Sequence, residues 1–422
     1  MAKTSGARPA ADAAVAAIDG ERLWRRLMSM AEIGATAKGG VNRPTLSPDD
    51  VRAKRLLADW ARARGFAVSQ DALGNLFVRR AGREGAAPVM TGSHLDSQPT
   101  GGKFDGAYGV LAGLEVIEAI DDAGIETRRP IEVAAWTNEE GWRFQPGCTG
   151  SLHYTRQIDL ARLAGVRDWN GVGFAAALEE CLAALPLPVH DGAIPSAYVE
   201  AHIEQGPRLE AAALTIGVVD AVQGSEKWLV TITGEDAHAG TTPHALRRDA
   251  LQAAVAAIAA LGALMADPAD VMRFTVGRLV VEPGSPNVVP GRCTFTIDMR
   301  HPDLAVIDRL SARVPETIAD AAARHGCSVE AKRLAHVDPT RFDPGIVAAV
   351  RAAASGLGLP HMDMISGAGH DAMHLAKICP SGMIFIPCAR GVSHNETESA
   401  TAADCAAGAR VLAATLLKLA QS

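Results

Sequence analysis

The sequence predicts an α/β protein in which a smaller domain is inserted into a larger one. Strand-like and helix-like segments alternate through the first half of the 422 residues, which is the pattern of a sheet covered by helices. From about residue 226 the order becomes β-α-β-β-α-β, the ferredoxin-like arrangement, and the first pattern resumes near residue 337. The predicted domains are therefore residues 1–222 joined to 337–422, with residues 223–336 as the insert.

The first helix with clear boundary signals covers residues 47–65. Ser47 is placed to cap its N-terminus, Pro48 suits its first turn, and Gly65 ends it. The following segment, AVSQDALGNLFVRR, alternates as strands do and has turn residues at Gly74 and Asn75, so a strand–turn–strand is expected.

Two apolar strands come next, and each leads into a polar loop. The segment PVMTGSHLDS is typical of a short strand that leads into a polar loop, and IEVAAW (residues 131–136) of a second, buried strand. Between them, residues 108–124 have helical spacing and stop at Gly124. Since functional sites of α/β sheets collect at the C-terminal ends of strands, these loops are the first places to look for one.

The insert has its own succession of elements. We expect strands at 227–234, 272–282, 292–300 and 328–337, and helices at 247–266 and 304–326. The Ala-rich run at 251–266 is shorter than the roughly 20 residues that a membrane span needs, so it is expected to pack on protein.

Composition excludes several classes of protein. A net charge of -7 provides no basic surface for nucleic acid. The seven cysteines form no CxxC pair, and their odd number fits reduced thiols in a cytoplasm. Residues 1–20 lack a continuous apolar core, so we interpret them as a loose tail or a first helix rather than a signal peptide. A cytoplasmic protein with no membrane or nucleic-acid partner is expected.

Histidines and acids gather in five polar loops. These are GSHLDS (92–97), GGKFDGAYGV (101–110), NEEG (138–141), AHIEQGP (201–207) and VSHNE (392–396). Any one of them alone would be an ordinary turn. Together they suit a hydrolase with two metal ions, which needs neutral imidazoles, carboxylates and one bridging carboxylate.

The adjacent acids Glu139 and Glu140 follow the buried strand 131–136, where unpaired carboxylates are costly. A two-metal site resolves this, because one acid can bind metal while the other takes a proton from water. The nearby Cys148 has no His partner in the pattern that would make it a nucleophile.

Eight motifs in order resemble the hydantoinase/carbamoylase amidases, from about residue 20 to the C-terminus. They are GSHLDSQPTGGKFDGAYGVLAGLE, WTNEEGWRFQPGCTGS, AHIEQGP, DAHAGTTP, PNVVPG, DMR, GAGHDA and SHNE. The resemblance implies a mixed-sheet, aminopeptidase-like catalytic domain with an inserted lid. It also implies a homodimer formed through that insert, and two divalent metal ions, which are zinc or else manganese, cobalt or nickel.

The same resemblance assigns metal ligands. His94 and His202 would hold one ion, Glu140 and His394 the other, and Asp105 would bridge the two.

The resemblance also assigns the acids around the ligands. Glu139 would be the general base, and Asp96 would orient the imidazole of His94.

Four further residues resemble substrate ligands of the family. Gln205 would contact the ureido group, and His238, Asn287 and Arg300 would hold the substrate carboxylate and the developing oxyanion, some of them across a dimer interface. Arginine suits a carboxylate because its planar fork bonds both oxygens.

The implied reaction cleaves the ureido C–N bond of an N-carbamoyl-L-amino acid or N-carbamoyl-β-alanine, giving amino acid, ammonia and carbon dioxide. The segment CTGS (148–151) resembles the pattern of the fungal-type β-ureidopropionases, and this resemblance favours carbamoyl amino acids over allantoate. An allantoate amidohydrolase, an aminoacylase or dipeptidase with the same metals, and a non-catalytic binding relative remain alternatives. Trp142 stands where relatives often have a small residue, and either narrows the pocket or packs.

Overall fold

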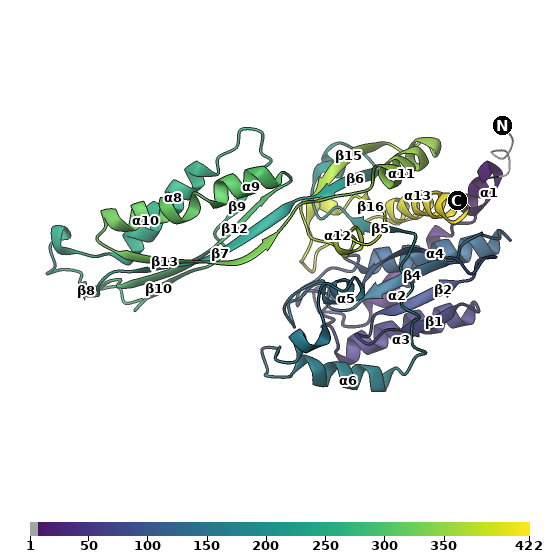
Figure 1. The fold of residues 1–422 in the computed structure, drawn as a ribbon, viewed down its shortest axis with the longest axis horizontal. Coiled ribbons are helices and arrows are strands. Elements are labelled where there is room, and N and C mark those ends of the chain that lie inside the picture. The colour runs from purple at the N-terminus through teal and green to yellow at the C-terminus, as the bar shows by residue number, and fades with distance from the viewer. Residues whose placement is uncertain (1–6) are drawn as a thin grey trace. The chain divides into compact units, whose positions relative to one another are not determined.

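The computed structural model describes residues 7–422 and separates into two compact units (Figure 1). Unit 1 comprises Met1–Asp220 with Phe342–Ser422, and unit 2 comprises Ala221–Arg341. Helix α1 (Ala7–Ala16) falls in the segment expected to be a tail or first helix, of which residues 1–6 lie outside the described part.

Unit 1 holds most of a mixed sheet, of which β14 and the last two residues of β6 fall within the bounds of unit 2. Along the sheet the order is β1-β2-β4-β3-β5-β16-β6-β14, with β15 paired to β6. The pairs β4–β3, β3–β5 and β5–β16 are parallel, and the outer pairs are antiparallel. The strands are β1 (Ala67–Gln70), β2 (Leu76–Arg80), β3 (Val89–His94), β4 (Ile131–Trp136), β5 (Ala197–Ile203), β6 (Ile216–Val222), β14 (Thr340–Arg341), β15 (His361–Ser366) and β16 (Ser381–Ile386).

Helices cover this sheet. They are α2 (Gly20–Ala31), α3 (Pro48–Ala63), α4 (Ala107–Asp122), α5 (Thr149–Tyr154), α6 (Phe174–Ala184), α7 (Arg208–Ala211), α11 (Pro344–Gly356), α12 (Ala372–Leu375) and α13 (Ala402–Ala420). The side chain of Ser47 accepts a hydrogen bond from Asp50 N, so the predicted cap of α3 is confirmed. Helix α4 packs on β3, β5 and α13. Its buried Glu115 is held by Arg22 of α2, which offsets the cost of burying that charge.

The parallel strands place the polar loops at one edge of the sheet. In the β3–β4 register His94 lies opposite Trp136, and in the β5–β16 register His202 lies opposite Phe385. The chain therefore leaves β3, β4 and β5 on the same side. This is why loops more than a hundred residues apart in sequence can meet.

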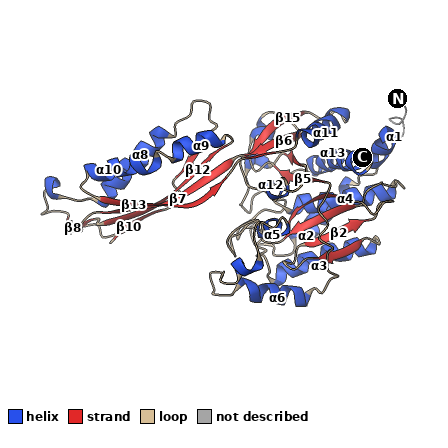
Figure 2. Cartoon of the chain, viewed as in Figure 1, coloured by secondary structure: helices blue, strands red, loops and turns tan. Residues whose placement is uncertain are grey.

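Unit 2 is a five-stranded antiparallel sheet, in the order β10-β12-β7-β13 with β9 on β12. Figure 2 shows its three helices on one side of that sheet. The elements are β7 (Gly224–Thr233), α8 (Ala250–Leu264), β9 (Arg273–Thr275), β10 (Leu279–Glu282), β12 (Arg292–His301), α9 (Leu304–Ser311), α10 (Val314–Arg324) and β13 (Ser328–Val337), with the short pair β8 (Ala237–His238) and β11 (Val288–Val289).

Two elements predicted as continuous are divided. The strand expected at 272–282 is β9 and β10, and the helix expected at 304–326 is α9 and α10. Pro315 lies in the first turn of α10 and has no N–H for the preceding turn, which explains the break between the helices.

Helix α8 buries one face and leaves the other open. Ala253, Ala257 and Leu261 are buried against β7, β12 and α10, whereas Val255 is 52% exposed. Neither α8 nor any other helix within residues 7–422 combines the length and apolar character required to cross a membrane.

Candidate metal centre

The carboxylate of Asp105 lies between two groups of possible metal ligands. Its Oδ1 is 3.5 Å from His94 Nε2 and 3.2 Å from His202 Nε2. Its Oδ2 is 3.4 Å from His394 Nε2, and that nitrogen is also 3.4 Å from Glu140 Oε2. The two groups, His94–Asp105–His202 and Asp105–Glu140–His394, are thus joined by one carboxylate.

These distances fit shared metal ions better than hydrogen bonds. Most of them exceed the 2.7–3.2 Å that N–H···O bonds normally span. Two ligands about 2.0–2.1 Å from one tetrahedral zinc lie roughly 3.3 Å apart, which is the separation found here. Imidazole and carboxylate donors suit zinc and other divalent transition ions. The predicted set of five ligands is therefore brought together, and the donor set fits two metals.

The backbone prepares His94 and Asp105 for this arrangement. Gly106, which caps α4, has φ of 63°, and a Cβ there would lie 2.4 Å from the His94 ring. Only glycine combines this left-handed conformation with such a close approach. The glycine after Asp105 is thus explained by the ring that must lie against it.

The imidazoles present their Nε2 atoms to the centre. His94 Nδ1 donates to the carbonyl oxygen of Asp96 at 2.8 Å, and His202 Nδ1 donates to that of Ile203 at 2.9 Å. A carbonyl only accepts, so each Nδ1 carries a proton, and in the neutral ring Nε2 is then the nitrogen whose lone pair can bind a metal. The N–H of Gly106 points at His202 Nε2 from 3.2 Å, as expected for an unprotonated nitrogen.

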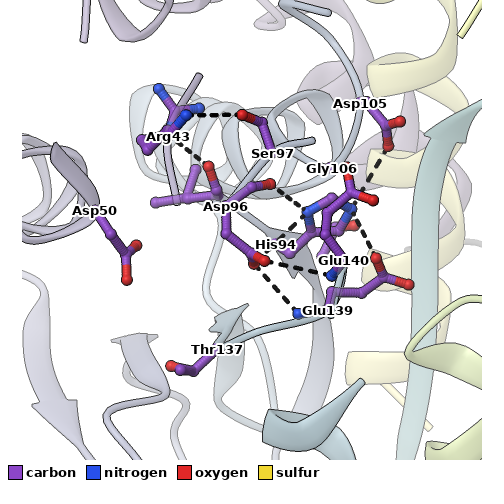
Figure 3. A network of polar contacts seen from close by, with 12 residues as sticks. Arg43, Asp50, His94, Asp96, Ser97, Asp105, Gly106, Thr137, Glu139 and Glu140 are labelled. Atoms are coloured by element: carbon purple, nitrogen blue, oxygen red, sulfur yellow. Dashed lines mark hydrogen bonds and ion pairs between the residues drawn. The ribbon is translucent and has the colours of Figure 1, made fainter. Parts of the chain in front are cut away.

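Asp96 acts differently from the expectation that its carboxylate orients His94. The carboxylate lies 3.9 Å from His94 Nδ1, and its main-chain carbonyl makes the bond instead. The two carboxylate oxygens accept the backbone N–H groups of Glu139 and Glu140, at 3.2 and 3.3 Å (Figure 3). One residue therefore fixes both the imidazole and the acid pair, through different atoms.

Glu139 stands beside the two ligand groups without belonging to either. Its Oε2 is 3.5 Å from His94 Nε2, and its Oε1 accepts from the thiol of Cys148 at 3.4 Å. Burial raises the pKa of the Cys148 thiol well above its usual value, so the thiol stays protonated and donates. Cys148 is therefore a neighbour of Glu139 and not a nucleophile.

The site is rich in negative charge. Burial raises the pKa of Glu139 well above its ordinary value, and it raises that of Glu140 to about 7, with the Asp105 carboxylate adding to the effect. Within the part of the chain that the structure describes, the ion-pair partners of Glu139 and Glu140 are histidines, His94 and His394. Bound divalent cations would supply the missing positive charge and keep both acids ionised.

The centre is more open on one side. The side chains of His94 and His202 are each 2% exposed, whereas that of His394 is 51% exposed. Water and a small substrate can therefore approach from the His394 side.

Trp142 packs against the loop that follows β3. Its indole N–H donates to the carbonyl of Ser97 at 2.6 Å, and its own carbonyl accepts from the indole of Trp169 at 3.1 Å. The sequence left open whether Trp142 narrows the pocket or packs, and these contacts show that it packs.

Sequence reasoning missed Glu398, a buried acid next to the bridge. Its carboxylate accepts from the N–H of Asp105 at 3.0 Å and from the hydroxyl of Ser393 at 3.0 Å. Burial raises its pKa to about 7. The signal available in the sequence was an acid four residues after His394, but nothing there indicated that it faces Asp105.

The GAGHDA motif supplies a second layer behind the ligands. The ring of His370 lies edge-on to that of His202, with centroids 4.7 Å apart. The carboxylate of Glu200 accepts from Ser93 and from the N–H of Ala372. Glu200, His202 and His370 also form a third group of possible ligands, but hydrogen bonds already occupy the Glu200 oxygens.

The predicted substrate residues fall into separate places. Gln205 lies at the metal centre, where its amide donates to Asp105 Oδ2 at 3.0 Å and its buried Oε1 has no partner among the described residues. His238 and Asn287 are neighbours, since Val288 pairs with His238 and Asn287 accepts from Ala239 N.

Arg300 is remote from His238 and Asn287 within unit 2. Arg292 pairs with Thr233 at the β8 end of the sheet, whereas Arg300 pairs with Ser225 at the other end. Eight residues of strand at about 3.3 Å each separate these positions by roughly 26 Å. One chain therefore does not bring the predicted carboxylate and oxyanion ligands of the insert together.

The fold and the donor set define a class: hydrolases whose mixed α/β domain carries a candidate pair of metal sites at the strand ends. The chain belongs to the peptidase family M20/M25/M40, whose profile matches residues 90–418, and within it to the hydantoinase/carbamoylase amidases. It is therefore an enzyme that hydrolyses carbon–nitrogen bonds other than peptide bonds, and the predicted family is confirmed.

Particular relatives support this membership. The chain is 41% identical over 407 residues to an N-carbamoyl-L-amino-acid amidohydrolase of Rhizobium meliloti, covering 96% of this chain and 97% of that one. The crystal structure of a hydantoinase/carbamoylase family amidase from Burkholderia multivorans matches with a TM-score of 0.90 and 46% identity, over 96% and 98% of the chains. An allantoate amidohydrolase of Bacillus subtilis is 33% identical over 395 residues, covering 93% and 95%.

Proposed function

We propose that the protein is a two-metal amidohydrolase that cleaves the ureido C–N bond of an N-carbamoyl amino acid, releasing the amino acid, ammonia and carbon dioxide. The observation that carries the proposal is the Asp105 carboxylate between two ligand groups, with Glu139 beside them and outside both. This is the division of labour that the adjacent acids Glu139 and Glu140 permit.

Two divalent ions held by these groups would supply Lewis acidity, lowering the pKa of water and polarising the ureido carbonyl. Glu139 takes the proton from the attacking water and returns it to the leaving nitrogen. Asp96 holds the backbone of Glu139 in place for both transfers. Gln205, with an unpartnered buried oxygen, offers an acceptor for a ureido N–H.

The side chain of His238 is prepared to donate. Its Nδ1 accepts from the N–H groups of Gly240 and Thr241, at 3.0 and 3.1 Å. In the neutral ring the proton is therefore on Nε2, where it can stabilise an oxyanion. This supports the role that the family resemblance gives His238.

The substrate assignment is tested by ammonia release. N-carbamoyl-L-amino acids, N-carbamoyl-β-alanine, allantoate and N-acetyl amino acids would be offered in parallel, with amine release measured for the acetyl compounds. The proposal expects the highest kcat/KM on a carbamoyl amino acid. Preference for allantoate would favour the second candidate, which the similarity to the Bacillus subtilis enzyme supports. Turnover of acetyl compounds alone would indicate an aminoacylase, and no turnover would indicate a binding relative.

Arg300 is proposed to clamp the substrate carboxylate. In this structure its fork is bidentate with Asp298 of the same strand, at 2.9 and 3.1 Å. The guanidinium is thus already arranged for two carboxylate oxygens. The substrate would have to replace Asp298 or bind beside it.

Arg300→Lys is expected to lower kcat/KM because lysine keeps the charge and loses the fork. A hydrogen bond to a charged group contributes about 1.5–3 kcal/mol, so a loss of roughly 10–150-fold is expected. Kinetics on a carboxylate substrate and on its amide provide the measurement: the mutant should lose most of the wild-type preference for the carboxylate. Arg292→Lys, on the same strand but paired with Glu282, is the matched control. Full retention of the preference in Arg300→Lys would assign the carboxylate to another residue.

We propose that unit 2 is a ferredoxin-like lid through which two copies form a homodimer. The roughly 26 Å of β12 that separates Arg300 from Arg292, at the β8 end of the sheet where His238 and Asn287 lie, supports this, because residues of two chains could then complete one substrate site. The open apolar face of α8 offers a surface for the second copy, related by a two-fold axis.

Sedimentation velocity is expected to give a dimer for the wild type and a monomer with much reduced activity for Val255→Arg. Arginine at this 52% exposed position places a charge on the proposed apolar interface. Val189→Arg, at an 87% exposed position of unit 1, is the control and should remain dimeric. A fully active wild-type monomer would contradict the proposal.

A cytoplasmic location is proposed as well. All seven cysteines are free thiols, which fits a reducing compartment.

A further inference from the structure

The carboxylate of Glu398 connects two loops that come from opposite ends of the sequence. We infer that Glu398 is a positioning residue for the metal centre, holding the Asp105 loop and the His394 loop in one arrangement. The inference rests on the proposed metal-dependent function. It adds a residue that none of the candidate ligand groups contains.

The contacts of Glu398 use both carboxylate oxygens. Oε1 accepts the N–H groups of Phe104 and Asp105, at 2.9 and 3.0 Å, and Oε2 accepts the hydroxyl of Ser393 at 3.0 Å. The residue is 4% exposed. Buried donors and acceptors that have found partners are expensive to separate, so these bonds fix the loops to each other.

Gly102 provides the space that Glu398 occupies. A Cβ at position 102 would lie 2.0 Å from Glu398 Cδ and 2.0 Å from its Oε1. Any side chain at this position would displace the carboxylate. The second glycine of the GGKFD segment is therefore explained by Glu398 rather than by a turn.

The geometry gives Glu398 influence over both ligand groups. Asp105 faces His94 and His202 with one oxygen and His394 with the other, so a movement of its backbone changes both sets of distances. Ser393 precedes His394 and also lies 3.0 Å from Asp105 Oδ2. Residues that hold metal ligands in place typically contribute 10–100-fold in metal affinity.

Zinc dissociation constants test the inference. Metal-free full-length protein would be titrated with zinc against a chromogenic chelator, at a temperature where circular dichroism shows every variant folded. Glu398→Ala is expected to bind zinc 10–100-fold more weakly, with the larger loss at the Asp105–Glu140–His394 group, because Ser393 is released together with Asp105. Glu398→Gln retains an acceptor for both N–H groups and should bind zinc nearly as the wild type does.

The control separates positioning from general stability. Glu226 is also fully buried and accepts from Trp228, but it belongs to unit 2, which carries no predicted metal ligand. Glu226→Ala should lower the thermal stability of the metal-free protein while leaving zinc affinity unchanged.

Gly102→Ala is a second variant that tests the same inference, also in the case that Glu398→Ala does not fold. Gly102→Ala should weaken zinc binding by pushing the carboxylate away. Where Glu398→Ala does fold, adding Gly102→Ala to it should cause little further loss, because the group that Gly102→Ala displaces is already gone.

Zinc affinity of Glu398→Ala equal to the wild type would overturn the inference, as would Glu398→Gln binding as weakly as Glu398→Ala. In either case the proposed function would stand. A wild-type protein that binds no zinc, manganese, cobalt or nickel would instead overturn the proposed function.

Discussion

Glu139→Gln is expected to lower kcat by about 10²–10⁴-fold or more, while metal content and KM stay near those of the wild type. General base catalysis contributes a factor of this size, and glutamine has the shape of glutamate without its ability to accept a proton. Glu139 is suited to the task because it lies 3.5 Å from His94 Nε2 and is absent from both ligand groups. The measurement is steady-state ammonia release, together with metal analysis of the purified variant.

The neighbouring acid provides the contrast. Glu140→Gln should lose metal, because an amide oxygen is a weaker ligand than a carboxylate and Glu140 lies 3.4 Å from His394 Nε2. The two variants therefore separate the roles of adjacent residues. Near-normal turnover in Glu139→Gln, or metal loss in Glu139→Gln equal to that in Glu140→Gln, would contradict the assignment.

Removal of metal is expected to abolish activity, and a divalent transition ion is expected to restore it. Without the ions the ureido carbonyl and the attacking water lose the Lewis acid that would activate them, and burial, which raises the pKa of Glu140 to about 7, favours protonation of that acid. Chelation followed by titration with zinc, manganese, cobalt or nickel, with turnover measured at each step, tests this. Full activity in rigorously metal-free protein would exclude the mechanism.

Removal of metal by chelation should also reduce the thermal stability of the protein. An ion present at 100 times its dissociation constant stabilises the folded state by about 2.7 kcal/mol. Differential scanning calorimetry of apo- and reloaded protein therefore gives a reading that does not depend on turnover. An unchanged unfolding temperature on reloading would indicate that the ions do not bind the folded protein.

The strand pattern was enough to predict where the ligands would gather. His94 ends one short strand and the acid pair follows another, and parallel strands bring such ends together. The helix caps and the general fold class could also be predicted from the sequence, because they depend on residues that are close to one another along the chain. Ser47 at the start of α3 is one example.

Contacts between segments that are far apart in the sequence could not be predicted from it. Glu398 meets Asp105 across 293 residues, and the sequence gives no sign that Gly102 leaves room for it. The pairing of Arg300 with Asp298 depends on side-chain conformations, since alternate residues of a strand share a face and compete for the same partners. Which atom of Asp96 holds His94 was likewise a matter of geometry, not of residue type.

The shared carboxylate of Asp105 constrains how this enzyme can evolve. Each oxygen serves a different ligand group, so a substitution at position 105 alters both at once. If both groups hold ions as proposed, a lineage cannot adjust one ion's environment through this residue and leave the other untouched. Glu140 and His202 each belong to a single side of the bridge. Gradual drift in metal preference is therefore expected to begin at such outer positions, with Asp105 the last of the ligands to change.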